Sequence, residues 1–553
     1  MKKISLPNLI LLSVILFFLA GYVGYPLYAI ISESIKTPDG ISFSAYSKIF
    51  DGNVFVALKN SLWLSLITIA GSLLIGLILS ATLFFLKIPL KSFFSTLFLI
   101  PIATPPIVSV TAFAYLLGEY GLLTGFLKKY FAQSTNFAID GWPAIILIHL
   151  YSFYPYFFLF ISNSLKKLDA DILDASKILG ASKLTTFAKI VIPHISTSVI
   201  SATIIVFMAS MASFSAPFIF GSSERFVTTE IYSAKVNNDY TLAAVLAVML
   251  TTISVFFLAG VRYFDRFEKN YASKGVTKVY NVEMKKRMSI PGFIISIIIS
   301  VFVLLPVLAL AYLSFLPEGS LMRDVLIEKF TFENYINMFT QPELFSPFRN
   351  SILMSLVSVL MSLFIGISVA VLVARENIPG KRLVEISSTL PYAIPATVVA
   401  LAFIISFNTP TIFTGFNVLV GTFWILPLAY AVRNIPIVTQ SAIAGMKLIN
   451  PDLESASRSL GAGRLRTMFK VTAPLLLPTI INASLLVFIA SVGEFVATIF
   501  LYTYETKTVS VEIYSHMRLY NTGTGASYGM LLFFIVMLIV YISRKTIDRS
   551  VRV

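Results

Sequence analysis

The chain has 553 residues, of which 57% are hydrophobic and 12% are charged, and its formal net charge is +15. At a mean hydropathy of +0.85 it holds more apolar surface than a soluble domain can bury, so the composition excludes a soluble protein and predicts an integral membrane protein. The lack of cysteine excludes disulfides and thiolate metal sites, and three histidines are too few for a histidine-rich metal centre.

Hydrophobic runs long enough to cross a bilayer recur along the whole chain. A spanning helix needs about 20 mostly apolar residues. We expect six such helices in each half, at 6–31, 61–86, 93–117, 142–165, 195–220 and 241–261, and then at 290–316, 351–374, 384–407, 417–440, 475–502 and 525–543. Lys2 and Lys3 precede the first run, which has no clear small-residue cleavage site, so we interpret it as a retained helix that starts in the cytoplasm.

Basic residues are unevenly distributed between the loops of the two sides. With the N-terminus placed inside, the cytoplasmic segments carry 29 Lys and Arg and the outer segments carry 12. Cytoplasmic loops of membrane proteins carry the basic excess, so we expect both termini to be cytoplasmic. The asymmetry also explains the net charge without a nucleic-acid partner. Arg433 falls inside a predicted span, near the inner end of 417–440.

The second half of the chain repeats the first. Residues 59–61 (KNS) match 349–351 (RNS) at an offset of 290, and residues 230–233 (EIYS) recur at 512–515 at an offset of 282. Because each half has six spans, both halves have the same orientation. This predicts a parallel repeat about an axis along the membrane normal.

The expected fold is therefore all-α and integral to the membrane, with twelve transmembrane helices arranged as two parallel six-helix repeats. We divide the chain into a first repeat, 1–261, a basic cytoplasmic linker, 262–289, and a second repeat, 290–553. The linker holds eight basic residues. Contact with anionic lipid is one explanation for them, and ordinary positive-inside bias is the simpler one.

Two polar segments match most closely between the halves, residues 169–193 and 450–474. In each, a triplet of short side chains is followed four residues later by Gly and thirteen residues after that by Pro. The pattern predicts a capped short helix, a sharp turn at Gly and a second helix. A solvated loop would explain one copy, whereas two copies at constant spacing favour a corner where a partner docks. The residues of this pattern are Asp174, Ala175, Ser176, Gly180, Pro193, Glu454, Ser455, Ala456, Ser457, Gly461 and Pro474.

Glu494 is the clearest ionisable residue inside a predicted span. A carboxylate at such a depth costs about 2.5–3.5 kcal/mol on insertion scales, and the equivalent residue at an offset of 281 is Ser213. Glu494 is either a pathway or gate residue or a structural hydrogen-bond acceptor near the outer helix end. Ser210, Ser213 and Ser491 either line the same pathway or allow close helix packing. We interpret His149 as a hydrogen-bonded structural residue rather than a ligand.

Nothing in the sequence indicates catalysis. No phosphate-binding loop or dinucleotide fingerprint is present, and no nucleophile–base pair or paired carboxylates stand out within the spans. We therefore expect no enzymatic activity, no metal site and no cofactor in this chain.

The paired polar segments resemble the cytoplasmic EAA loops of binding-protein-dependent ABC importer permeases, in which E-A-A-x-x-x-G is followed at a fixed distance by Pro. Asp174 stands for the leading Glu in the first copy, and Ser455, with Glu454 beside it, in the second. The resemblance covers nearly the whole chain. It implies the type I importer transmembrane fold in a bacterial inner membrane. It also implies two copies of a separate ATPase, which bind ATP and Mg and dock on the two loops, and an extracytoplasmic binding protein that delivers solute for alternating access.

A permease with two fused halves is similar to the ferric-iron type. The segments 213–217 (SFSAP) and 228–232 (TTEIY) also resemble sequences of that group. Thiamine and phosphonate permeases share much of this pattern, so these solutes remain alternatives. An alternative of another class is a secondary transporter driven by an ion gradient. The scarcity of intramembrane carboxylates and the duplicated loops favour the ATP-driven importer.

Overall fold

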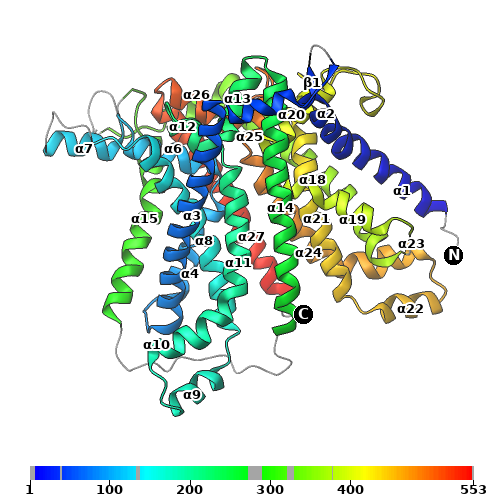
Figure 1. Cartoon of the computed structure of the whole chain (residues 1–553), viewed down its shortest axis with the longest axis horizontal. Coiled ribbons are helices and arrows are strands. Elements are labelled where there is room, and N and C mark those ends of the chain that lie inside the picture. The colour runs from blue at the N-terminus through cyan, green and yellow to red at the C-terminus, as the bar shows by residue number, and fades with distance from the viewer. Residues whose placement is uncertain are drawn as a thin grey trace. The chain divides into compact units, whose positions relative to one another are not determined.

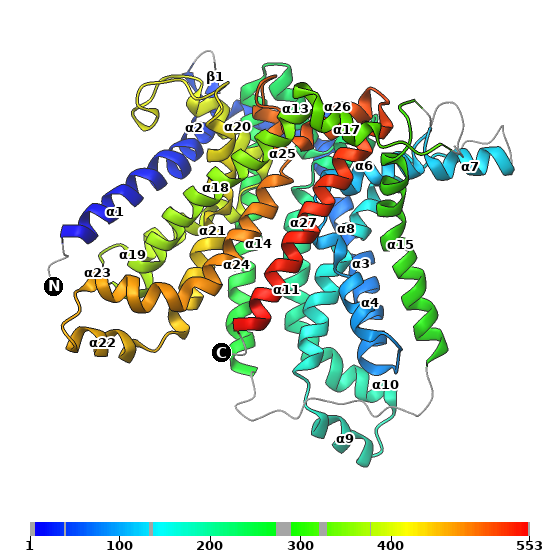
Figure 2. The same cartoon turned by 180° about the vertical axis from the view of Figure 1, so that it is seen from behind.

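The computed structural model describes residues 6–37, 40–131, 137–271, 289–319, 329–376 and 378–550. Within these ranges the chain is almost entirely helical (Figures 1 and 2). The strands found there are β1 (Lys36–Thr37) and β2 (Gly40–Ile41), which pair antiparallel. The structure therefore confirms the all-α class.

The helices form two compact units. We call residues 49–230 and 252–331 the N unit, and residues 1–48, 231–251 and 332–553 the C unit. Each unit thus includes the first helix of the opposite sequence half. The compact units therefore differ from the sequence division at 262–289, and residues 272–288 of that linker lie outside the described residues.

The N unit is built around three long helices, α3, α8 and α11, which pack against one another, while α15 packs on α4 and α6. Two helices, α13 and α14, run from one unit into the other. The elements are α3 (Gly52–Phe85), α4 (Lys91–Leu97), α5 (Ile100–Ala103), α6 (Pro106–Leu117), α7 (Leu122–Tyr130), α8 (Gly141–Lys166), α9 (Ala170–Ile178), α10 (Lys183–Thr186), η3 (Phe187–Val191), α11 (Ile192–Met211), α12 (Ser215–Phe220), α13 (Val227–Val236), α14 (Tyr240–Tyr271) and α15 (Ile290–Ser314).

The C unit repeats this plan with α18, α21 and α24 at its centre, while α2 packs on α20 and α27 on α24. Its elements are α1 (Leu6–Leu19), η1 (Ala20–Gly24), α2 (Tyr25–Ser34), η2 (Ser44–Phe50), α17 (Glu333–Thr340), α18 (Pro342–Arg375), α19 (Lys381–Thr389), η4 (Leu390–Ala393), α20 (Ala396–Phe407), η5 (Ile412–Thr414), α21 (Ile425–Leu448), α22 (Pro451–Ser459), α23 (Arg464–Thr467), η6 (Met468–Thr472), α24 (Ala473–Val492), α25 (Val496–Leu501), α26 (Val509–Arg518) and α27 (Thr522–Ser550).

Ten helices in the described ranges are long and apolar enough to cross a membrane, and one bent pair, Lys381–Ala393 with Ala396–Phe407, raises the number to eleven. A count of twelve is thus not confirmed. The run predicted at 417–440 accounts for the difference, because its helix α21 carries Arg433 and Asn434 and is not among the ten. Since α21 begins only at Ile425, Arg433 lies in its first half, and the prediction that placed it near the other end is wrong.

Four predicted spans are not continuous helices. The runs 93–117 and 384–407 break before α6 and α20, where Thr104 (ψ 125°) and Ile394 (ψ 121°) are extended. Each of these residues precedes a proline, whose ring disfavours the helical conformation of the residue before it. The runs 195–220 and 475–502 also break, between α11 and α12 and between α24 and α25. Ser213 and Glu494 lie in these two breaks. The prediction that both residues lie inside continuous helices is therefore wrong.

The same close helix crossing occurs in both units. A Cβ added to Gly76 of α3 would lie 2.5 Å from Phe157 Cβ of α8, and one added to Gly366 of α18 would lie 2.7 Å from Val438 Cβ of α21. The two glycines are 290 residues apart and their partners 281 apart. Small residues let helix backbones approach closely within a membrane, so the duplicated sequence produces a duplicated crossing.

Candidate coupling loops and buried polar clusters

Both segments predicted as helix–turn–helix have that structure. The first helix begins at a side-chain cap: Asp169 Oδ1 accepts from the Asp171 amide at 3.1 Å before α9, and Asn450 Oδ1 accepts from the Asp452 amide at 3.0 Å before α22. In the N unit α9 and α10 lie at the end away from α7, and in the C unit α22 and α23 lie at the end away from α26 (Figures 1 and 2).

The turn that follows each helix requires glycine for its backbone angle. Gly180 has φ +75° and Gly461 has φ +82°, and nothing lies within 4 Å of a Cβ added to either. The amides of Ala181 and Ala462 donate to the carbonyls of Ser176 and Ser457 at 3.0 and 3.1 Å. This is the helix ending in which a left-handed residue, usually Gly, satisfies the last carbonyls.

The small-residue triplets divide into an exposed and an internal part. Ser176 is 6% exposed and lies 3.1 Å from Thr186 Oγ1 of α10, and Ser457 lies 3.0 Å from Thr467 Oγ1 of α23. These hydroxyl pairs hold the two short helices of each loop together. The four other triplet residues, Asp174, Ala175, Ser455 and Ala456, are exposed and available to a partner.

Each loop also exposes a leucine that the sequence reasoning missed. Leu179 is 86% exposed and Leu460 is 88% exposed, directly before the two turn glycines. A large apolar side chain held in water at the same corner of both repeats indicates a surface that is covered in an assembly. The signal was present in the sequence, because Leu precedes Gly in both copies.

The second loop is fastened by an ion pair that the first loop lacks. Glu454 is 8% exposed; its carboxylate lies 3.0 Å from Arg375 Nε at the end of α18 and accepts from Thr472 Oγ1 at 3.1 Å. The equivalent of Glu454 is Leu173, which is 3% exposed in the core of the N unit. Glu454, predicted as a docking residue, is therefore turned into its own unit and positions α22.

The sequence predicts a new helix at Pro193 and Pro474, but the helix continues without a break through both prolines, from Lys183 to Met211 and from Met468 to Val492. A π-helical turn (η3 or η6) lies directly before each proline-containing stretch. A proline has no N–H and disrupts a regular α-helix, and the wider π turn is one way in which a helix adjusts to such a residue.

A buried polar cluster lies at the centre of the N unit. His149 Nδ1 lies 3.0 Å from Thr68 Oγ1 and 3.2 Å from Ser210 Oγ, and its Nε2 lies 3.0 Å from Ser213 Oγ. These contacts from α3, α11 and the break after α11 engage both ring nitrogens of His149. The arrangement agrees with the interpretation of His149 as a hydrogen-bonded structural residue.

The C unit has the equivalent cluster with a different composition. Ser358 Oγ lies 3.2 Å from Ser491 Oγ, which also accepts from Asn434 Nδ2 at 3.1 Å. Ser358 and Ser491 are the repeat partners of Thr68 and Ser210 at offsets of 290 and 281. The structure thus brings Ser210 and Ser213 together in one unit and places Ser491 in the matching position of the other.

Glu494 is a fully hydrogen-bonded carboxylate beside this second cluster. Its Oε1 accepts from Arg433 Nη1 at 3.1 Å and from the Ala497 amide at 2.9 Å. Its Oε2 accepts from the Thr498 amide at 2.9 Å and from Thr498 Oγ1 at 2.8 Å. Glu494 therefore caps α25 and pairs with α21. Sequence reasoning missed Arg433 as the partner, because the predicted span was shifted along the chain.

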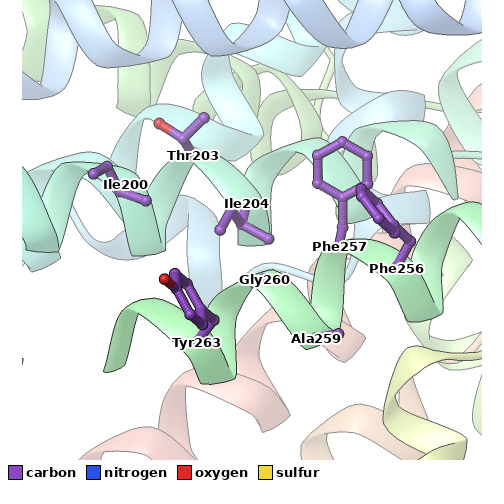
Figure 3. Close-up of a pocket in the computed structure, with 8 residues that line it drawn as sticks. All are labelled: Ile200, Thr203, Ile204, Phe256, Phe257, Ala259, Gly260 and Tyr263. Atoms are coloured by element: carbon purple, nitrogen blue, oxygen red, sulfur yellow. The ribbon is translucent and has the colours of Figure 1, made fainter. Parts of the chain in front are cut away.

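Two other features bear on what the described residues could bind. They contain no group of three or more His, Asp and Glu side chains able to hold a metal ion. A groove of about 460 Å³ lies between α11 and α14 of the N unit, lined by Ile200, Phe256, Phe257 and Tyr263 among others (Figure 3). Its walls are almost wholly apolar, which suits contact with acyl chains rather than a charged solute.

The family model described as binding-protein-dependent transport system inner membrane component matches residues 72–269 and again residues 362–553. The chain belongs to this family. The double match confirms the fused two-half form, and the permease is accordingly a multi-pass membrane component of a binding-protein-dependent ABC importer rather than an enzyme.

Three curated relatives show the range of this similarity. The permease is 25% identical over 87% of its length to a probable ABC transporter permease, y4fN, of Sinorhizobium fredii, covering 84% of that protein. It is 27% identical over 96% of its length to the ferric transport system permease FbpB of Actinobacillus pleuropneumoniae, covering 77% of it. It is 34% identical over 32% of its length to the molybdenum transport system permease ModB of Escherichia coli K12, covering 81% of it.

Proposed function

We propose that the permease moves ferric iron, delivered by an extracytoplasmic binding protein, across a bacterial inner membrane into the cytoplasm by alternating access. The observation that carries the choice of iron is the similarity to a ferric permease over 96% of the chain. Similarity to a molybdenum permease over 32% of the chain makes an oxyanion the second candidate. Thiamine and phosphonate remain alternatives from the sequence pattern alone.

We further propose that two copies of a separate ATPase, which bind ATP and Mg, dock on the two helix–turn–helix loops. The support is the repeated corner at which Leu179 and Leu460 are exposed beside Gly180 and Gly461. In this proposal both loops and both chain termini face the cytoplasm. Asp174, Ala175, Ser455 and Ala456 contact the ATPases, whereas Ser176, Ser457 and Glu454 keep the loops in shape.

The two polar clusters are the proposed lining of the translocation route. Ser210 of α11, Ser213 of the break after α11 and Ser491 of α24 supply hydroxyls of these clusters. Glu494 contributes as a cap that holds α25 against α21, because its oxygens accept from Arg433 and from the amides of Ala497 and Thr498 and also contact the Thr498 hydroxyl. It is therefore not proposed as a ligand for the iron.

Coupling is tested by uptake of radiolabelled ferric iron in cells that carry the permease with its binding protein and ATPase. Gly461→Ala should reduce uptake strongly, because a Cβ at φ +82° costs about 1–2 kcal/mol and distorts the corner. Gly463→Ala is the matched control, since Gly463 is two residues away, has ordinary φ and has free space around its Cα.

Normal uptake in Gly461→Ala combined with Gly180→Ala, with the ATPase still bound, would remove the coupling role from the loops. Uptake that survives ATP depletion and stops when the ion gradient is collapsed would instead support the secondary transporter. Absence of iron uptake by the unmodified permease, with molybdate taken up, would replace iron by the oxyanion.

A further inference from the structure

We propose that Arg433 is an anion-recognition point on the translocation route, so that solute passes the C unit as an anion or as a metal complex that presents anionic oxygen ligands. The proposal rests on the permease function, and it depends on the ferric-iron proposal only for the choice of cargo. It is based on the hydrogen bonds that the Arg433 and Glu494 side chains form and on the donors that they leave unused.

Arg433 and Glu494 differ in how many hydrogen-bond donors or acceptors they leave unused. The Glu494 side chain is 6% exposed; Oε1 accepts two hydrogen bonds, and Oε2 accepts one from the Thr498 amide and shares the single Thr498 hydroxyl hydrogen with the Glu494 carbonyl. A carboxylate has about four lone-pair positions, and at least three of them are taken, so the nearly buried Glu494 has little capacity left for a cation. The Arg433 side chain is 32% exposed and donates one hydrogen bond, from Nη1, within the described part of the chain. A guanidinium carries five donors in a rigid fork, so the free capacity of the pair consists of donors.

The position of the Arg433–Glu494 pair along the membrane normal indicates what surrounds the exposed part of Arg433. Asn434, the neighbour of Arg433, bonds to Ser491, which in turn contacts Ser358. Ser358 lies midway along α18, a helix of 34 residues and so about 50 Å long, which exceeds the hydrocarbon thickness of about 30 Å. A guanidinium exposed to hydrocarbon at this depth is costly, and charged groups in spans face the protein interior or water-filled cavities. The exposed part of Arg433 is therefore assigned to an aqueous route.

Glu494 orients the guanidinium for this purpose. The carboxylate is fixed by two backbone amides at the start of α25, so its hydrogen bond at 3.1 Å to Nη1 holds the guanidinium of Arg433, whose side chain is 32% exposed. A planar guanidinium held in this way suits bidentate binding of carboxylate, phosphate or another oxyanion.

The feature belongs to one repeat alone. At an offset of 281 the equivalents of Arg433 and Glu494 are Ser152 and Ser213. The fold of a unit thus forms without the charged pair, since the N unit has the same helix break with serine at both places. A role in fold alone does not account for the presence of the pair in the C unit.

The test measures anion binding to the full-length permease in lipid nanodiscs, with citrate and inorganic phosphate as probes at constant ionic strength. The readouts are the dissociation constant from calorimetry and the rise in the unfolding midpoint with anion concentration. Arg433→Gln should weaken binding at least tenfold. Lys447→Gln, which removes an exposed positive charge from the same helix α21, is the matched control and should bind as the unmodified permease does.

Arg433→Gln leaves Glu494 without its ionic partner and can misfold. A second variant therefore replaces both residues by serine, the residue found at both equivalent positions of the first repeat. Arg433→Ser combined with Glu494→Ser removes both charges and keeps a residue that caps α25 well. This variant should be as abundant as the unmodified permease and should show the same loss of citrate binding.

Three outcomes separate the possibilities. Weakened binding in both Arg433 variants, with Lys447→Gln unaffected, supports the proposal. Binding that persists in the double variant, or no anion-dependent shift in the unmodified permease, overturns it. If the unmodified permease binds citrate through Arg433 but cells take up no labelled ferric citrate, the anion site stands and the ferric-iron proposal fails.

Discussion

The close crossing of α3 and α8 can be tested with two glycines of one helix. Gly71 and Gly76 both face α8, and an added Cβ would come within 2.5 Å of it in each case. At Gly76 the nearest atoms are Phe157 Cβ and, at 2.8 Å, the backbone nitrogen of Phe158. At Gly71 all three of the nearest atoms belong to the side chain of Leu150. The two sites therefore differ in whether the neighbour can move.

The expected magnitudes follow from this difference. Carbon atoms prefer separations of about 3.5–4.0 Å, and overpacking that shifts backbone costs about 1–3 kcal/mol. Replacing Gly by Ala within a helix stabilises the folded state by about 0.5–1 kcal/mol, because Ala loses less conformational entropy on folding. We thus expect Gly76→Ala to destabilise the N unit by about 1–2 kcal/mol. For Gly71→Ala a rotation of the Leu150 side chain costs about 0.5–1.5 kcal/mol, which the helix gain largely offsets.

The assay is thermal unfolding of the purified permease, followed by tryptophan fluorescence. Trp142 at the start of α8 packs on Phe226 with ring centroids 5.5 Å apart and reports on the N unit, provided that Trp424 of the C unit is replaced by Phe in all variants. For a unit of about 260 residues, a loss of about 1–2 kcal/mol corresponds to a midpoint lower by about 2–8 °C. Gly71→Ala should shift the midpoint by less than about 2 °C. Equal shifts for the two variants would refute the reasoning, because it depends on the contrast between backbone and side-chain neighbours.

Two further predictions concern the loops. A cysteine introduced at Lys183 should resist an impermeant thiol reagent added to intact cells and react after permeabilisation; labelling of intact cells would reverse the proposed orientation. Glu454→Leu should destabilise the C unit by about 2–3 kcal/mol, because it leaves Arg375 at the C-terminal end of α18 without its ionic partner, while the Nη2 hydrogen bond of Arg375 to the Met446 carbonyl remains. Arg375→Phe combined with Glu454→Leu reproduces Phe85 and Leu173 of the first repeat. This double variant should recover most of the lost stability in thermal unfolding. If it does not, the Arg375–Glu454 ion pair is not what holds the second loop against the C unit.

Local sequence signals predicted the helix–turn–helix structure of the two loops well. A cap before each first helix and the turns at Gly180 and Gly461 depend on neighbouring residues only, so the repeated pattern was sufficient to predict them. Which residues cap the helices, Asp169 and Asn450, came from the structure. Helix breaks were harder. The sequence at Pro395 carries the signal for a break, yet the uniformly apolar run on both sides of it predicts one continuous span.

Features that depend on tertiary packing could not be predicted. Arg433 and Glu494 are 61 residues apart in the chain, and no periodicity links them. The burial of Glu454 was hidden because its partner Arg375 lies at the end of a distant helix. The exchange of first helices between the compact units was also hidden, since α1 and α15 are both uniformly apolar and their sequences do not indicate which helices they cover.

Because each compact unit includes the first helix of the opposite half, the order of synthesis differs from the order of packing. The helices α1 and α2 leave the ribosome first, but α2 packs on α20, which begins at Ala396. At about 5–20 residues per second, the wait is about 20–70 s. During this time the first helices need the lipid or an insertion factor as a temporary neighbour. For the same reason, a chain cut within 272–288 yields two fragments, neither of which contains a whole unit. Completion of either unit therefore requires residues from both halves of the chain.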